Sequence, residues 1–263
     1  MSQNASEGPV RVAPGQVAVI TLDRPAVFNA LNADVLRRLD QAHRDLLADP
    51  VTRAIVITGA GGKAFSAGAD LDEISTVDVD RADAFVGYGQ QVFRRLELSP
   101  VPVIAAVNGL ALGGGFELVL SCAFSVFSTT ASVGLPESGL GLIPGYGGTQ
   151  RLARLVGAGP ALELMLTGQP VSAAEALRLG LVNRVVPAAA LREEVETLAR
   201  TIASKPPIAA RYIIEAVNKG LQMSMPEGLA FEAALFGLVA STEDMREGTR
   251  AFLEKRKPEF KGR

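Results

Sequence analysis

Apolar residues occur along this chain in two alternating patterns. Short runs rich in Val, Ile and Ala predict buried β-strands at residues 17–22, 54–58 and 103–107. Shorter runs at residues 124–127 and 131–134 predict two further small strands, separated by Ser and Thr. These runs are too short for helices and are bounded by polar or turn residues.

Between the strands the apolar residues follow a helical period. Asn32 offers an N-cap for a helix with an apolar stripe. The stripe consists of Val35, Leu36, Leu39, Leu46 and Leu47. Residues 81–98 predict a second helix that ends before Pro100. Strands that alternate with helices predict an α/β core.

Strand signals thin out from about Gly147 onward. Ser172 and Glu175 have the spacing of a capping box. Helical patterns then follow at residues 188–203, 207–219, 227–240 and 243–255. We therefore expect a flexible N-terminus over residues 1–16, a core over residues 17–200 and a helical appendage over residues 201–263.

Composition narrows the possible functions. The 263 residues carry a net charge of -2 and are 48% hydrophobic, which suits a chain with a sizeable core and argues against nucleic-acid binding. No apolar window is long enough for a membrane span. One Cys (Cys122) and one His (His43) argue against a disulfide framework and a Cys/His metal site, and favour a reducing, cytoplasmic location. Both residues are expected to be packed structural side chains.

The residues most indicative of chemistry are 105–117, where a buried run leads into Gly113, Gly114, Gly115 and then Glu117. Glycines at the start of a helix leave backbone N–H groups free and open to a ligand. A carboxylate three residues after Gly114 lies on the same helix face. This pattern predicts a backbone anion site beside an acid/base group.

A second glycine-rich segment, at residues 59–64, fits the spacing of a dinucleotide-binding loop. No helical period follows it, so a surface turn is the better interpretation. Residues 65–70 instead predict another loop with exposed backbone. Glu137 lies in a Gly- and Pro-rich run with few other charges; from the residues alone, a turn role and a catalytic role are about equally supported.

Together these segments resemble the crotonase superfamily, and more narrowly the enoyl-coenzyme A hydratases. The resemblance covers residues 17–263 and rests on motifs in one order along the chain. The motifs are Leu22-Asp23-Arg24-Pro25, residues 29–31, 64–71 and 108–117, Leu135-Pro136-Glu137, residues 147–152 and residues 251–256.

The resemblance implies a spiral of ββα turns with a C-terminal helical trimerisation domain, assembled as a trimer or as a hexamer of two trimers. It implies an acyl-coenzyme A substrate and no separate cofactor or metal. Addition of water to a 2-enoyl thioester is the expected reaction. Isomerisation of an enoyl thioester, or another crotonase reaction, is an alternative, and a non-catalytic acyl-thioester binding protein is a remote one.

Motif by motif, the resemblance places the oxyanion hole at the N–H groups of Ala69 and Gly114, and the catalytic pair at Glu117 and Glu137. It implies coenzyme A contacts from six residues: Arg24, Ala67, Asp70, Leu71, Phe252 and Lys255. Two positions that are often basic in the family are Ala26 and Asp72 here. Binding of the nucleotide end of coenzyme A is therefore expected to depend more on Phe252, Lys255 and Arg24. Residues 74–88 and 140–146 are the expected walls of the acyl pocket.

Overall fold

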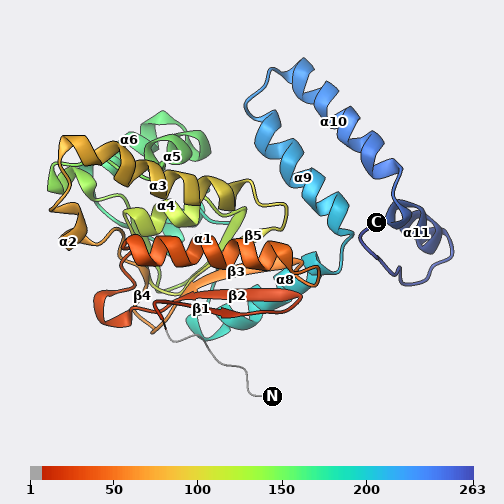
Figure 1. Ribbon diagram of the computed structural model, residues 1–263, viewed down its shortest axis with the longest axis horizontal. Helices are drawn as coiled ribbons and strands as arrows, with labels where there is room; N and C mark the ends of the chain where they lie inside the picture. Colours follow the sequence, from red (N-terminus) through yellow and green to blue (C-terminus); the bar gives the residue numbers. More distant parts are fainter. Residues whose placement is uncertain (1–7) are drawn as a thin grey trace.

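The structure is a computed structural model that describes residues 8–263. Its elements, in chain order, combine two sheets with helices that cover them and a helical C-terminus (Figure 1). The chain is therefore a mixed α/β protein, as the sequence predicts.

Six strands form the larger sheet, in the order β1-β2-β3-β5-β7-β10. They are β1 (Val10–Ala13), β2 (Val17–Leu22), β3 (Ala54–Gly59), β5 (Val103–Val107), β7 (Phe124–Ser128) and β10 (Arg184–Val186). Neighbours pair in parallel except β1 and β2. All five residues of β5, a central strand, are buried, as expected for a parallel strand covered on both faces.

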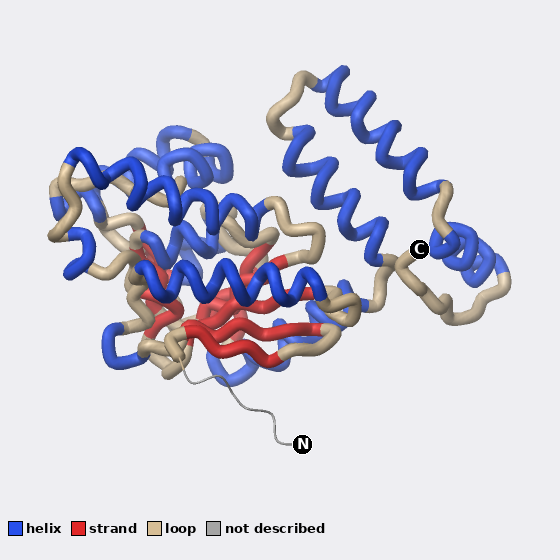
Figure 2. Tube along the Cα trace, in the orientation of Figure 1, coloured by secondary structure: helices blue, strands red, loops and turns tan. Residues whose placement is uncertain are grey.

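A second sheet has the order β4-β6-β8-β9, with β4 (Ala64–Ser66), β6 (Leu110–Leu112), β8 (Ser132–Gly134) and β9 (Val171–Ser172). Along the chain, β3, β5 and β7 each contribute to the large sheet, and β4, β6 and β8, which follow them, each contribute to the small one. Figure 2 shows the strands gathered inside the body with helices around them. This repeated turn brings the ends of β4, β6 and β8 to one region.

Helices cover the sheets on both sides (Figure 1). On one side are α1 (Ala33–Ala48) and α3 (Val79–Glu97), which join the largest cluster of buried apolar residues, with α4 (Gly114–Leu120) and α5 (Gly148–Val156) beyond them. On the other side α8 (Leu191–Ala203) packs Leu191, Val195 and Ala199 against the large sheet. The expected N-cap is present: the Asn32 side chain accepts a hydrogen bond from the Val35 N–H.

The remaining short elements connect these layers. They are η1 (Pro25–Val27), α2 (Leu71–Ile74), η2 (Glu137–Leu140), α6 (Ala158–Thr167), α7 (Ala173–Arg178) and η3 (Ala188–Ala190). The C-terminal helices are α9 (Pro207–Gly220), α10 (Met225–Ala240) and α11 (Glu243–Leu253). In Figure 1 α9 and α10 form a hairpin beside the body, and α11 follows α10 on the side of the hairpin away from the body.

Three expectations need correction. Residues 10–13, expected within a flexible N-terminus, form β1, because Val10 can pair with Leu22 and become buried; residues 1–7 lie outside the described residues. Helix α8 continues to Ala203, so the expected boundary after residue 200 cuts a helix that packs on the body. The capping box at Ser172 is only half formed, since the Glu175 carboxylate pairs with Arg178 instead.

Candidate active site

The three consecutive glycines join β6 to α4, and each is required for a different reason. Gly113 has φ 50°, a left-handed conformation that favours glycine, and a Cβ there would lie 2.9 Å from Glu137 Oε1. A Cβ on Gly114 would lie 3.3 Å from the Ala69 nitrogen. A Cβ on Gly115 would lie 2.3 Å from the Ser66 carbonyl oxygen, so this glycine allows α4 to pack closely on β4.

Ala69 is held in place by a one-residue bridge to Leu31. The Leu31 N–H donates to the Gly68 carbonyl and the Asp70 N–H donates to the Leu31 carbonyl. These two bonds lie on one side of the backbone, so the Ala69 N–H faces the other side, toward Gly114. Neither the Ala69 nor the Gly114 N–H donates a hydrogen bond to an atom of residues 8–263. Two free donors therefore lie next to each other.

Glu117 lies in the first turn of α4 and is 1% exposed. Its Oε1 accepts a hydrogen bond of 2.7 Å from the N–H of Gly148, the first residue of α5. Burial raises the pKa of this carboxyl to about 7, and the Glu137 charge contributes in the same direction. Hydrogen bonds from the backbone of Gly148 and Tyr146, and the charge of Arg151, act in the opposite direction.

Glu137 is the first residue of η2 and approaches the same glycines from the other side. Its Oε1 lies beside Gly113, while its Oε2 is buried without a hydrogen-bond partner among the described residues. Burial raises the pKa of this carboxyl as well. Two carboxylates with raised pKa values therefore flank the free N–H groups of Ala69 and Gly114, a grouping suited to proton transfer beside a developing oxyanion.

Tyr146 packs beside this group. Its ring lies against Gly114 and Gly89, contacts Phe93 edge-on, and lies 6.3 Å from the ring of Phe85. Its hydroxyl is buried without a partner within residues 8–263. The segments expected to form the acyl pocket thus contact one another, because Phe85 belongs to one segment and Tyr146 to the other.

Four of the expected coenzyme A contacts lie together around the loop that carries Ala69 and faces Gly114. The Arg24 guanidinium pairs with Asp70 at 3.0 Å and donates to the Ala30 carbonyl at 2.8 Å. Asp70 also caps α2. Ala67 and Leu71 are exposed beside them. Arg24 and Asp70 therefore fix the loop that carries Ala69, whereas the side chains of Ala67 and Leu71 are exposed and could contact a ligand.

The other two expected contacts are not brought to this region. Phe252, which is 83% exposed, and Lys255 lie at the end of α11. Figure 1 shows α11 on the opposite side of the molecule from α2 and α4. Within one chain these two residues therefore lie away from the helix that carries Glu117.

Sequence reasoning gave no role to several residues that shape the site. Gly148 and Arg151 belong to a motif used for the resemblance, yet only the fold shows that the N-terminus of α5 meets Glu117. Asn29 is buried and donates to the carbonyls of Ala60 and Ala64. A buried Asn between Phe28 and Ala30 has no periodic signal, so only the structure reveals it.

Metal-binding groups and membrane-spanning helices are the remaining features to consider. No group of three or more His, Cys, Asp or Glu side chains suited to a metal ion occurs in the described part of the chain. None of its helices is both long enough and apolar enough to span a membrane.

Known proteins resemble this chain over almost its whole length. A sequence model of the enoyl-CoA hydratase/isomerase family matches residues 13–263. The chain is 47% identical to a short-chain-enoyl-CoA hydratase of Clostridium acetobutylicum, covering 95% of this chain and 96% of that protein. It is 45% identical to a crotonyl-CoA hydratase of Syntrophomonas wolfei, covering 93% and 94%.

Solved structures agree with the sequence comparison. An enoyl-CoA hydratase from Bacillus anthracis superposes with a TM-score of 0.94 at 42% identity and covers 97% of this chain and 100% of that one. The resemblance found in the sequence motifs is confirmed by both comparisons. This chain belongs to the enoyl-CoA hydratase/isomerase family of the crotonase superfamily.

Proposed function

We propose that this protein is an enoyl-CoA hydratase that adds water across the 2,3-double bond of a 2-enoyl-CoA thioester to give a 3-hydroxyacyl-CoA. The observation that carries the proposal is the meeting of two carboxylates, the buried Glu117 and the half-buried Glu137, beside two adjacent free N–H groups. Relatives at 45–47% identity that are named short-chain and crotonyl-CoA hydratases support it.

The N–H groups of Ala69 and Gly114 are the proposed oxyanion hole. The thioester oxygen gains negative charge as water adds at C3, so donors aimed at that oxygen stabilise the transition state more than the substrate. Because the first-turn N–H of α4 and the Ala69 N–H are already free and fixed, little reorganisation is needed during the reaction.

Glu117 and Glu137 are the proposed acid/base pair. With a pKa near 7, Glu117 exists in both protonation states close to neutral pH, which suits either acceptance or delivery of a proton. One carboxylate takes a proton from the attacking water while a proton is delivered to C2. As neighbouring groups, the two titrate as a pair. The reaction needs no cofactor, and coenzyme A is part of the substrate.

Binding of coenzyme A is proposed at Arg24, Ala67, Asp70 and Leu71, which lie around the loop that carries Ala69. Asp72, exposed at the start of α2, adds a negative charge there, so a phosphate would be repelled rather than held. Phe252 and Lys255 are proposed to complete the site from a neighbouring copy of the chain, because α11 lies far from its own Glu117.

The C-terminal helices α9 to α11 are the proposed oligomerisation segment of a trimer or of a hexamer of two trimers. Helix α9 buries no residue in one chain and α10 buries only Leu235. Large exposed apolar side chains cover the hairpin: Ile213, Val217, Leu221, Met225, Leu229, Phe236 and Leu238. Such a surface is typical of an obligate interface. A cytoplasmic location and a role in short-chain fatty acid metabolism fit this proposal.

The test is direct. Incubation of the purified protein with crotonyl-CoA should abolish the absorbance of the conjugated enoyl thioester, and the product should weigh one water more than the substrate. An isomerase would convert a 3-enoyl thioester to the 2-enoyl isomer without a change in mass and would add no water to crotonyl-CoA. A binding protein without activity would retain crotonyl-CoA unchanged, and either result would contradict the proposal.

A further inference from the structure

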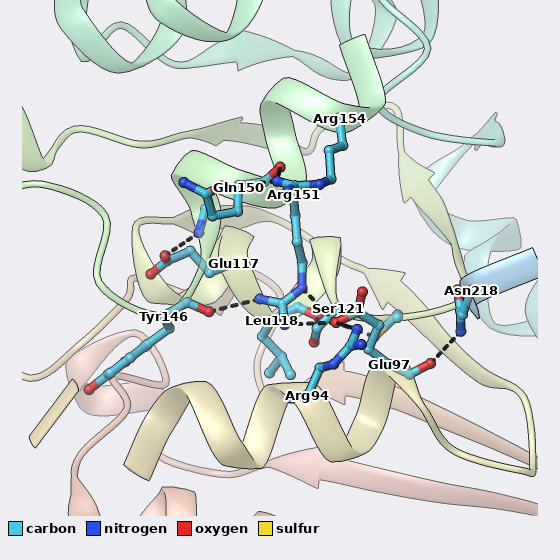
Figure 3. Close-up of polar contacts among 12 residues, drawn as sticks. Arg94, Glu97, Glu117, Leu118, Ser121, Tyr146, Gln150, Arg151, Arg154 and Asn218 are labelled. Atoms are coloured by element: carbon cyan, nitrogen blue, oxygen red, sulfur yellow. Dashed lines mark hydrogen bonds and ion pairs between the residues drawn. The ribbon is translucent and has the colours of Figure 1, made fainter. Parts of the chain in front are cut away.

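Arg151 of α5 lies between Glu117 and the C-terminal hairpin, and the expected chemistry assigns it no role. Its side chain is 15% exposed and makes every polar contact on two partners (Figure 3). Nη1 donates to the Tyr146 carbonyl at 2.8 Å, while Nε and Nη2 donate to Glu97 Oε2 at 3.1 and 2.9 Å. A planar guanidinium presents donors on separate nitrogens to both partners in a fixed geometry, whereas an ammonium carries all its donors on one nitrogen.

The contact with Tyr146 fixes the turn that precedes α5. Gly147 has φ 107°, and a Cβ on it would lie 2.3 Å from Arg151 Nη1. The guanidinium therefore lies directly against the backbone of this turn. The next residue, Gly148, donates its N–H to Glu117 Oε1. Movement of the turn would change the bond that holds the Glu117 carboxylate.

Glu97, at the end of α3, holds the guanidinium from behind. Arg94 pairs with the same carboxylate oxygen at 3.0 Å. The Glu97 carbonyl accepts a hydrogen bond of 2.7 Å from the Asn218 side chain of α9. A continuous set of contacts thus links α9, Glu97, Arg151, the turn and Glu117 (Figure 3).

The charge of Arg151 also affects Glu117 directly. The positive charge of Arg151 lowers the pKa of Glu117 against the opposing effects of burial and of Glu137. It also lowers the pKa of the Cys122 thiol, which burial raises. The other titratable group facing Glu117 is the Tyr146 phenol. Strands β4, β6 and β7, which pack on α4, contain no titratable side chain.

We propose that Arg151 is a positioning residue for Glu117: its guanidinium fixes the Tyr146–Gly148 turn and supplies a positive charge near the carboxylate, and Glu97 fixes the guanidinium. The inference rests on the proposed hydratase function for its kinetic consequences only. A purely structural ion pair between Arg151 and Glu97 would stabilise the fold but would leave the titration of Glu117 unchanged.

The experiment compares Arg151→Gln, Arg151→Lys, Glu97→Gln and a control, Arg154→Gln, with the unmodified protein. Arg154 lies on the same helix, but within residues 8–263 its side chain donates hydrogen bonds to Gln150 alone. Two readouts are used: the pH profile of kcat/KM with crotonyl-CoA, and the titration of Glu117 by NMR of protein labelled with carbon-13 in glutamate. The signal of Glu117 is assigned by its loss in Glu117→Gln.

Arg151→Gln should raise the pKa of Glu117 and reduce kcat about 10- to 100-fold, because the turn is released. Glu97→Gln should also reduce kcat, by less than Arg151→Gln, because it frees the guanidinium that fixes the turn. Arg151→Lys should return the pKa toward its original value but leave kcat low. Arg154→Gln should match the unmodified protein in both readouts.

An unchanged Glu117 titration in Arg151→Gln, or an equal shift in Arg154→Gln, would overturn the proposal. If Arg151→Gln does not fold, Glu97→Gln decides: a reduced kcat beside an unchanged Arg154→Gln supports the proposal, and an unchanged kcat contradicts it. Should the protein show no hydration, the proposed function fails, but the NMR titration still tests the role of Arg151.

Discussion

The central side chain of the site is a carboxyl that the fold has taken out of water. Glu117 is fully buried, and its strongest partner is a single backbone N–H, that of Gly148. The backbone hydrogen bonds and the Arg151 charge do not compensate the desolvation of the carboxylate, so its pKa stays raised to about 7. Glu137 lies close enough to add to this effect. The environment, rather than the residue type, therefore raises the pKa of both glutamates and suits Glu117 to the proposed proton transfer near neutral pH.

Loss of either carboxyl should abolish most of the activity. Glu117→Gln and Glu137→Gln should each lower kcat for crotonyl-CoA by about 100-fold or more, because an amide cannot exchange the proton. The folded content, measured by circular dichroism, should be preserved, since glutamine keeps the shape and the acceptor for Gly148.

The matched control for this pair is Glu163→Gln, because Glu163 is exposed on α6 and its carboxylate has no hydrogen-bond or ion-pair partner among residues 8–263. Its kcat should equal that of the unmodified protein. Full activity in Glu117→Gln or Glu137→Gln would remove that residue from the proposed mechanism.

Burial of Glu117 should also make stability depend on pH in a defined direction. Its folded pKa, about 7, lies above its ordinary value of 4.5, so the folded state binds the proton more tightly than the unfolded state. This contribution to stability is complete below pH 4.5 and is lost as the pH rises through 7. At pH 8 the ionised carboxylate costs the folded state roughly 3 kcal/mol.

Glu117→Gln should therefore raise the thermal midpoint at pH 8 relative to the unmodified protein and raise it less at pH 5. Differential scanning fluorimetry over this pH range measures the effect. An equal change at both pH values would show that the folded-state pKa of Glu117 is not raised.

Among the connecting elements, the glycine turn into α4 combines three requirements in three adjacent residues. Gly113 gives a backbone conformation and space for Glu137, Gly114 gives access to the Ala69 N–H, and Gly115 gives close packing on Ser66. The oxyanion site and the helix–strand packing are therefore built from neighbouring positions with separable effects.

Substitution of the last two glycines should separate function from stability. Gly114→Ala places a methyl group beside the Ala69 nitrogen and should lower kcat about 100- to 1,000-fold with only a small change in the thermal midpoint. Gly115→Ala collides with a backbone carbonyl and should lower the thermal midpoint by several degrees. Thermal unfolding and kcat are measured on both. Equal loss of stability in the two variants would contradict this division.

Long elements with a clear period could be predicted from the sequence, whereas of the strands of two or three residues β8 was predicted and four others were not. Strands β2 and β5 and helix α1 agree with their predicted positions because many residues specify each of them. Strands β4, β6, β9 and β10 have two or three residues each, too few for a period, and their pairing is decided by distant strands. Of the proposed site, Gly114 and Glu117 could be named from the residues because glycines before a lone carboxylate mark chemistry, whereas Ala69 and the catalytic role of Glu137 were implied only by the family resemblance.

The partners of those residues could not be predicted from local sequence. Arg151 and Glu97 are 54 positions apart and meet only because α5 packs beside α3. The same limit applies to Phe252 and Lys255, whose separation from Glu117 depends on the path of the C-terminal helices (Figure 1).

The C-terminal hairpin of α9 and α10 exposes a large apolar surface. Helices α9 and α10 contact each other but leave most of their apolar side chains exposed, including Leu221 and Phe236 at 83% and 71%. A 27.5 kDa chain that exposes so much apolar surface is expected to assemble with further copies of itself.

Phe236→Glu should therefore reduce the mass of the assembly toward that of a single chain, because it places a charge in the proposed interface. It should also raise KM for crotonyl-CoA, since a neighbouring α11 would no longer supply Phe252 and Lys255. Light scattering coupled to gel filtration measures the mass, and Glu232→Gln, exposed on the same helix, is the control. An assembly of unchanged mass in Phe236→Glu would place the interface elsewhere.

The most direct test of the proposed function uses water labelled with oxygen-18. The protein is incubated with crotonyl-CoA in that water, and the product is weighed by mass spectrometry. Water addition at Glu117 and Glu137 predicts a 3-hydroxybutyryl-CoA that carries one labelled oxygen, and no such product from the Glu117→Gln variant. Recovery of an unlabelled thioester with the mass of the substrate would contradict the proposed function.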